Sequence, residues 1–144
     1  MLKGIPPVLS PDLLKTLAEM GHGDRIVLGD AYFASATMAK KNRLLRADGV
    51  PSLALVDAIL QLMPLDPYVE QPLALMDLSG GDTEIPPIWQ VYADTAARYE
   101  PDHYAFEKME RFAFYERAKK AYAIVATGES AIYANIILKK GVVK

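Results

Sequence analysis

Two side chains near the N-terminus could move protons near neutral pH: His22 and Asp30. His22 lies between Gly21 and Gly23, so no bulky neighbour shields its imidazole. Asp30 follows the apolar run Ile26-Val27-Leu28. Because the pKa of histidine is ordinarily about 6.5, an imidazole can act as acid and as base within one reaction cycle. The pair predicts acid-base chemistry, although an exposed histidine at a helix end and an aspartate that caps a turn explain the same residues without a function.

Two further groups have side chains that suit a polar ligand. Arg111 precedes the aromatic run Phe112-Ala113-Phe114-Tyr115. An arginine beside aromatic rings can bind the hydroxyls of a sugar and stack on its ring, although residues such as Phe112 and Phe114 are more often part of a core. Tyr133-Ala134-Asn135 places a phenol and a carboxamide just before an apolar run, which is a weak signal by itself.

Composition excludes several classes of function. The chain has 16 basic and 18 acidic residues and a net charge of −2, without a long run of one sign, which disfavours nucleic-acid and acidic-membrane partners. It has no cysteine, so it cannot use a thiol nucleophile or a zinc-thiolate site. His22 and His103 have no carboxylate at a metal-binding spacing, which predicts that no metal is bound. There is no glycine-rich phosphate loop and no Gly-x-Ser-x-Gly elbow. After these exclusions, the composition favours proton transfer on a neutral polar ligand without a cofactor.

An alternation of helical and apolar segments must position these groups. Cap residues, prolines and apolar periodicity predict helices over 10–20, 51–63, 86–99 and 112–121. Short apolar runs predict strands over 25–29, 43–47, 73–76, 122–126 and 135–138, with a possible edge strand over 105–109 and a loop over 31–41. Gly21 is expected to end the first helix as a left-handed cap. Strands that are apolar throughout and separated by helices predict an α/β fold with a mostly parallel sheet covered on both faces.

The 144 residues are expected to form one domain, residues 1–144. No apolar stretch reaches the roughly 20 residues that span a bilayer, and the N-terminus lacks the features of a signal peptide, so a cytoplasmic protein is expected. Ligands of α/β sheets bind beyond the carboxyl ends of the strands, where Asp30 should lie. His22 precedes the same strand and should lie at the opposite end. Either its loop folds back, or His22 works with groups of a neighbouring chain.

Five segments occur in an order that resembles a known family. They are Gly21-His22-Gly23-Asp24 with Asp30-Ala31, Arg46-Ala47-Asp48-Gly49, the run 111–118, Thr127-Gly128-Glu129 and the run 133–141. Together they closely resemble the ribose pyranase/fucose mutarotase family over residues 1 to about 142, and in particular its L-fucose mutarotase branch. The resemblance implies an RbsD-like, three-layer α/β/α fold with a mixed, mostly parallel sheet.

The resemblance also implies an isomerase that interconverts the α and β anomers of L-fucose without a cofactor or metal. His22 matches the family's proton donor, and Tyr115 is a possible second acid-base group. Asp30, Arg111 and the segment Tyr133, Ala134 and Asn135 match sugar-binding positions. The family forms ring-shaped oligomers, commonly decamers of two pentamers with sites between subunits, which would account for the placement of His22.

One segment departs from the family pattern and leaves the preferred sugar open. After Asp30-Ala31 the family usually continues with Asn or His and then Phe-Pro, whereas this chain has Tyr32-Phe33-Ala34. Two alternatives stay open. One is a D-ribose pyranase, which exchanges pyranose and furanose forms, and the run 111–117 favours the fucose branch over it. The other is a non-catalytic sugar-binding module that serves a transporter.

Overall fold

A computed structural model describes residues 1–144 and contains one six-stranded sheet with the strand order β2-β5-β1-β6-β3-β4. The strands are β1 (Arg25–Gly29), β2 (Arg43–Ala47), β3 (Leu73–Met76), β4 (Phe106–Met109), β5 (Ala123–Thr127) and β6 (Ile136–Lys139). Parallel pairs join β1 to β5, β2 to β5 and β3 to β4, whereas β6 is antiparallel to both of its neighbours. The sheet is therefore mixed but mostly parallel, as predicted.

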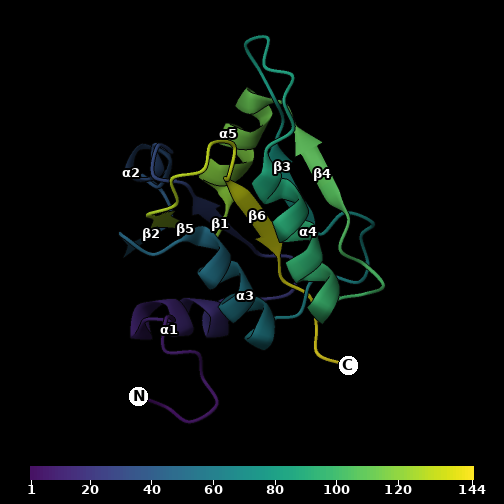
Figure 1. The fold of residues 1–144 in the computed structure, drawn as a ribbon. Coiled ribbons are helices and arrows are strands. Elements are labelled where there is room, and N and C mark those ends of the chain that lie inside the picture. The colour runs from purple at the N-terminus through teal and green to yellow at the C-terminus, as the bar shows by residue number, and fades with distance from the viewer.

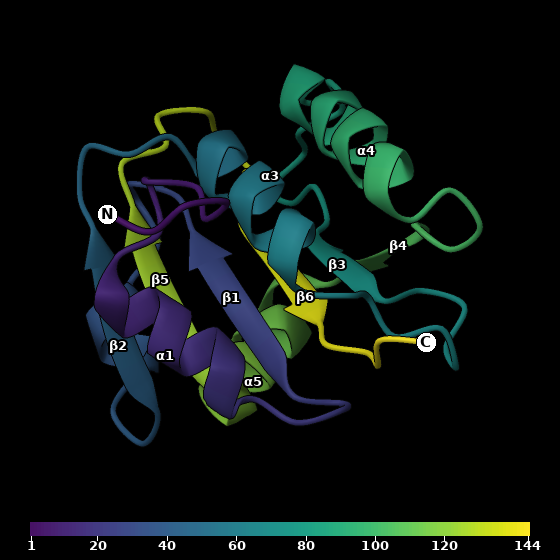
Figure 2. The same cartoon turned by 90° about the horizontal axis from the view of Figure 1, so that it is seen from below.

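Helices cover both faces of this sheet. The helices are α1 (Pro11–Glu19), α2 (Ser35–Met38), α3 (Ser52–Leu62), α4 (Pro87–Tyr99) and α5 (Arg111–Lys120). In Figure 1, α1, α3 and α4 lie in front of the sheet and α5 lies behind it, and the turned view in Figure 2 shows the same two layers. None of these helices combines the length and the apolar character needed to cross a membrane.

Alternation along the strands divides the core between the two faces. Ile26 and Leu28 of β1 belong to a cluster of 23 buried residues that also contains the inner sides of α1, α3 and α4. Val27, between them, belongs to a second cluster of 10 buried residues, together with Phe114 of α5. Successive side chains of a strand point to opposite faces, so a strand that is apolar at every position needs cover on both sides.

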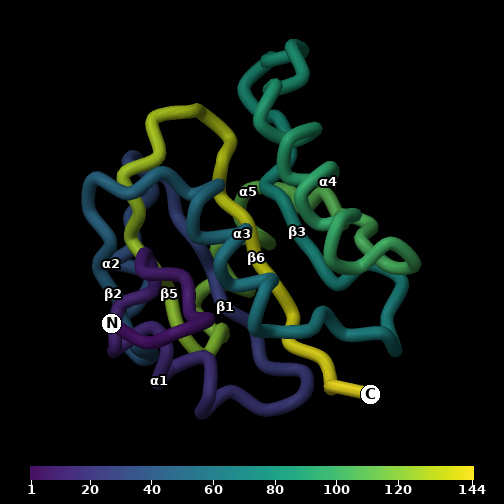
Figure 3. The backbone as a smooth tube through the Cα atoms, turned by 60° about the horizontal axis from the view of Figure 1, so that its bottom comes forward, coloured from purple at the N-terminus to yellow at the C-terminus, as the bar shows by residue number.

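The antiparallel strand β6 brings distant segments to one edge of the sheet. The carboxyl ends of β1, β3, β4 and β5 meet at this edge, and β6 begins there because it runs the other way. The segment 128–135, which precedes β6, therefore lies at the edge where β1 ends. Figure 3 shows this segment in yellow-green, at the opposite end of the molecule from the C-terminus.

Most predicted elements are confirmed, with three corrections. Gly21 does not have a positive φ, and α1 is instead capped by Met20, whose extended backbone donates its N–H to the Thr16 carbonyl. The predicted loop 31–41 contains the one-turn helix α2. Phe114 is buried as a core residue, but Phe112 is 65% exposed because it lies on the outer side of α5. The ambiguous segment 105–109 is strand β4 at the edge of the sheet.

Candidate functional site at the carboxyl edge of the sheet

A cavity of about 440 Å³ opens at the carboxyl edge of the sheet. Its lining includes five of the candidate residues from the sequence: Asp30, Arg111, Tyr115, Tyr133 and Asn135. They come from the end of β1, from α5 and from the segment before β6. This last segment reaches the cavity because β6 is antiparallel to β1 and so begins at the edge where β1 ends. A small polyhydroxylated ligand would meet a carboxylate, a guanidinium, two phenols and a carboxamide here.

Asp30 is the buried carboxyl of this cavity, with only 5% of its surface exposed. Its carboxylate accepts hydrogen bonds from the backbone N–H groups of Tyr32 (3.0 Å) and Ala134 (3.4 Å). Its own backbone N–H donates to Oδ1 of Asn135 at 2.7 Å. Burial raises the pKa of Asp30, although hydrogen bonds from the backbones of Tyr32, Ala134 and Phe33 oppose the shift. Ala134, whose side chain is buried, therefore contacts Asp30 through its backbone N–H.

Arg111 and Tyr115 form a second polar unit on the first turns of α5. The Nε–H of Arg111 donates to the Tyr115 hydroxyl at 2.7 Å, and the guanidinium lies 5.5 Å from the centroid of the same ring. This hydrogen bond raises the pKa of Arg111. The Tyr115 oxygen accepts from arginine and makes no other hydrogen bond, so its proton is free to be donated to a ligand in the cavity.

The Tyr133 backbone has an unusual conformation that aims the ring at the cavity. Its φ of 55° lies in the left-handed region, which costs a residue with a side chain about 1 kcal/mol. Helix α4 holds this conformation from behind, because the indole N–H of Trp89 donates to the Tyr133 carbonyl at 2.8 Å and the Tyr92 hydroxyl donates to the Ala134 carbonyl at 2.8 Å. The Tyr133 hydroxyl in turn contacts Asp82 and the backbone of Ser79.

The segment that departs from the family pattern forms one wall of the cavity. Tyr32, Phe33 and Ala34 all line it. Gly29 allows this wall to fold back over the end of β1, since a Cβ at Gly29 would lie 2.7 Å from the Phe33 ring. The Phe33 ring packs edge-on against Phe114, while the Tyr32 side chain is 69% exposed. The side chains of Tyr32 and Phe33 therefore determine the shape of this wall.

His22 lies at the other edge of the sheet and does not line this cavity. It precedes β1, whereas Asp30 follows it, and the strand between them separates the two side chains by on the order of 20 Å. The His22 loop does not fold back within the subunit. Its backbone is instead tied to the end of β6, where the Gly23 N–H donates to the Lys140 carbonyl at 2.8 Å.

A buried carboxylate holds the His22 ring in place. Nε2 of His22 lies 3.0 Å from Oδ1 of Asp66, which is 2% exposed. The Tyr68 N–H donates to the same oxygen at 3.0 Å, and the Lys139 ammonium lies 3.4 Å from the other oxygen. Burial by itself would raise the pKa of Asp66, but the hydrogen bonds from these three partners outweigh it and hold the pKa below its usual value. Asp66 is therefore an anion that orients one imidazole nitrogen of His22.

Sequence reasoning missed Asp66 and Tyr68. The Tyr68 ring lies 5.4 Å from the His22 ring, so both residues belong to the same cluster. Asp66 is 44 positions from His22 in the chain and becomes its neighbour only through the bridge between Leu65 and Lys140. The available signal was an aspartate directly after the apolar segment Leu62-Met63-Pro64-Leu65. His103, by contrast, pairs with Glu100 at 3.3 Å and lines neither site.

The raised pKa of Asp30 predicts how an Asp30→Asn variant responds to pH. The pKa of Asp30 is higher in the folded protein than in the unfolded chain, so the folded protein binds this proton more tightly. The proton therefore stabilises the folded state below the unfolded pKa of about 3.9, and this stabilisation is lost as pH rises through the folded pKa. Asparagine cannot ionise, so the variant does not lose this stabilisation. The free energy of unfolding of the variant, relative to that of the wild type, should therefore increase between about pH 3.5 and pH 7. Urea titrations at both pH values measure it, and an unchanged or decreasing difference would contradict the assignment.

The fold and this cavity define an α/β protein of RbsD-like architecture with a polar cavity at the carboxyl edge of its sheet. The chain belongs to the RbsD / FucU transport protein family, whose family model matches residues 3–143. It is 53% identical to a fucose mutarotase of Mus musculus, over 97% of this chain and 94% of that protein.

Solved structures support the same relationship. A crystal structure of the fucose mutarotase from Streptococcus pneumoniae in complex with L-fucose is 55% identical and has a TM-score of 0.93, covering 99% of this chain and 100% of that one. RbsD of Bacillus subtilis, in complex with D-ribose, is 23% identical with a TM-score of 0.73 over the whole of both chains. That second likeness shows the shared fold alone.

Proposed function

We propose that this protein is an L-fucose mutarotase, an isomerase that interconverts the α and β anomers of the free sugar without a cofactor. The observation that carries the proposal is the convergence of Asp30, Arg111, Tyr133 and Asn135 on one open cavity in a chain half identical to fucose mutarotases over its full length. Several directed donors and acceptors beside aromatic side chains suit a ligand that is polar at its edge and apolar on its ring face.

Mutarotation requires one proton to be removed and another to be added. A base takes the proton of the anomeric hydroxyl while an acid protonates the ring oxygen, so that the ring opens to the aldehyde. The C1–C2 bond then turns and the ring closes with the hydroxyl on its other face. Asp30 and Arg111 hold sugar hydroxyls, and Tyr133 and Asn135 orient the ring. His22 shuttles the proton, and Tyr115, with its hydroxyl proton free, is the second acid-base group.

This mechanism requires two copies of the chain for each site. His22 is fixed at the opposite edge of the sheet from Asp30, so it cannot reach a sugar in the cavity of its own subunit. We propose that His22 and Asp66 of one subunit face the carboxyl-edge cavity of the next. A head-to-tail contact whose rotation closes gives a ring, which is the arrangement of the pentamers and decamers that the family resemblance implies. The cytoplasmic location expected from the sequence stays a prediction.

The two alternatives are less well supported. If the chain were a D-ribose pyranase, it should be more similar to the ribose-bound relative than to the fucose-bound one. It is instead 23% identical to the ribose-bound relative and 55% identical to the fucose-bound relative. A binding module without catalysis would leave no reason for an oriented histidine paired with a buried carboxylate.

Saturation-transfer NMR of sugars at anomeric equilibrium tests the proposal. Saturation of the α-anomer signal of L-fucose should transfer to the β-anomer signal at a rate that rises with protein concentration. D-ribose and D-galactose serve as parallel substrates, and heat-denatured protein is the control. Faster exchange on ribose than on fucose would favour the pyranase, and line broadening without exchange would favour a binding module. Either result would overturn the proposal.

A further inference from the structure

A second cavity lies on the α5 face of the sheet, and its lining includes none of the residues proposed to bind the sugar or to move its protons. It measures about 560 Å³ and lies between the start of β1, α5 and the residues that lead into β5. Its basic side chains are Arg25, Arg117 and Lys120, and Met109 and Ala113 form an apolar wall. It shares no lining residue with the carboxyl-edge cavity.

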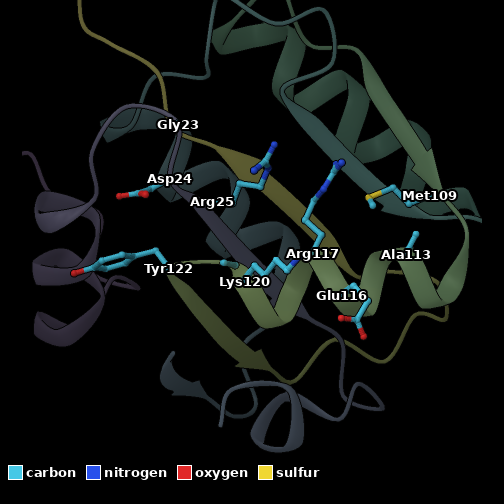
Figure 4. A pocket seen from close by; sticks show the side chains of 10 residues that line it. Gly23, Asp24, Arg25, Met109, Ala113, Glu116, Arg117, Lys120 and Tyr122 are labelled. Atoms are coloured by element: carbon cyan, nitrogen blue, oxygen red, sulfur yellow. The ribbon is translucent and has the colours of Figure 1, made fainter. Parts of the chain in front are cut away.

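The positive charges of this cavity are only partly neutralised. Figure 4 shows the guanidinium groups of Arg25 and Arg117 side by side and pointing the same way. Arg117 pairs with Glu107 at 2.6 Å, but neither Arg25 nor Lys120 takes part in any ion pair. Partial burial, and then the neighbouring charge of Arg117, lower the pKa of Arg25. Glu107, and then Asp66, offset part of the repulsion that Arg25 experiences. The two arginines together with Glu107 still carry a net charge of +1, which a bound anion would neutralise.

The acidic residues of the same cavity do not fill this role. The Asp24 carboxylate accepts a hydrogen bond from the Gly21 N–H at 2.8 Å, and Glu116 pairs with Lys119 at 3.1 Å. In Figure 4 both carboxylates point away from the paired guanidinium groups. The cavity therefore presents a cationic centre and keeps its own anions at the periphery.

The surrounding surface is also basic. A neighbouring cavity shares Glu116 and Lys120 with this one and adds Lys40, Lys41 and Lys119. These lysines give one face of a protein with a net charge of −2 a local positive potential. Such a potential increases the local concentration of small anions and the rate at which they associate.

We propose that this cavity binds a phosphomonoester of a small molecule, with the phosphate on Arg25, Arg117 and Lys120 and the ester group against Met109 and Ala113. The fork of N–H donors on a guanidinium matches the oxygens of a phosphate, and a lysine adds a point charge. The volume of about 560 Å³ has room for a body of monosaccharide size beside the phosphate. A small ester is favoured over nucleic acid because the cationic centre is a single recessed cavity and not a long groove.

Isothermal titration calorimetry in a low-salt, phosphate-free buffer tests this site. Inorganic phosphate, glucose 6-phosphate and glucose are titrated into the intact protein. Both phosphates should bind, glucose 6-phosphate more tightly, and glucose should not bind. Arg25→Gln and Lys120→Gln should each weaken phosphate binding about tenfold, because each removes a charge-assisted contact. Arg98→Gln removes an exposed arginine on α4 and should bind like the wild type.

Two further measurements distinguish this cavity from the active site. Saturating L-fucose should not displace the phosphate, and the Arg25 and Lys120 variants should keep wild-type anomer exchange. Lys120 lies exposed at the last position of α5, so its variant keeps the test valid if Arg25→Gln folds poorly. Displacement by fucose, equal affinity in the Arg25, Lys120 and Arg98 variants, or binding of a single-stranded oligonucleotide but not of glucose 6-phosphate would each overturn the proposal.

Discussion

Replacement of His22 by alanine will reduce protein-catalysed exchange of L-fucose anomers by about 100- to 10,000-fold, the range that a positioned acid-base group contributes. The His22 imidazole combines an exposed ring with an oriented nitrogen: its side chain is 44% exposed and Nε2 is held by Asp66. Alanine leaves the binding groups of the carboxyl-edge cavity in place. The loss should therefore fall on kcat, with a much smaller change in KM.

The fold of the His22→Ala variant should stay intact, because Asp66 keeps its contacts with the Tyr68 N–H and with Lys139. Loss of one hydrogen bond to a charged group costs about 1.5–3 kcal/mol, which circular dichroism during urea unfolding can measure. His103→Ala is the matched control, since it removes the other histidine of the chain, and it should keep full exchange. Exchange at the wild-type rate in a folded His22→Ala protein would exclude His22 as the proton shuttle.

Two inactive variants, His22→Ala and Asp30→Ala, will recover activity when they assemble together. If His22 of one subunit serves the cavity of the next, some contacts in a mixed ring pair an intact His22 with an intact Asp30. Random mixing of equal amounts gives about one quarter of such intact sites, since each of the two neighbours must be of the right kind. The mixed oligomer should therefore show about one quarter of wild-type exchange.

Co-expression with two different affinity tags, followed by purification over both, isolates the mixed oligomers for the NMR assay. Each variant purified alone provides the baseline. A mixture of His22→Ala with a tagged copy of itself controls for effects of the tags. Activity no greater than the baseline, from oligomers shown to contain both variants, would place His22 and Asp30 of one site in the same subunit and overturn the shared-site proposal.

Local patterns determined the elements of this fold. Ser10 and Pro11 start α1 as predicted, with the Ser10 hydroxyl accepting from the Leu13 N–H at 3.1 Å. The wholly apolar run 26–28 predicted a strand covered on both faces, and its side chains divide between the two core clusters. These features depend on neighbours in the sequence or on burial alone, so a single sequence reveals them. Gly21 was misinterpreted because glycine permits a left-handed cap but does not require one.

The residue types also indicated much of the candidate site. Asp30 follows an apolar strand, and Arg111, Tyr115 and Tyr133 belong to segments whose combined order resembles one family. The resemblance supplied the roles proposed for these side chains. The structure added that five of the candidates line one cavity, because β6 runs antiparallel and delivers the segment before it to the edge where β1 ends.

Only the tertiary structure decided which groups surround His22 and which face the cavity. Asp66 lies 44 positions away in the chain and meets His22 through a bridge between two segments that no local pattern connects. In the same way, Arg25 and Arg117 come from a strand and a helix, and their side-by-side charges become apparent only when α5 packs on the sheet. The sequence by itself determined the strands, the helices and the chemical groups at their ends. The pairing order and direction of the strands decided which of those groups meet, because contacts between distant segments depend on the topology of the whole sheet.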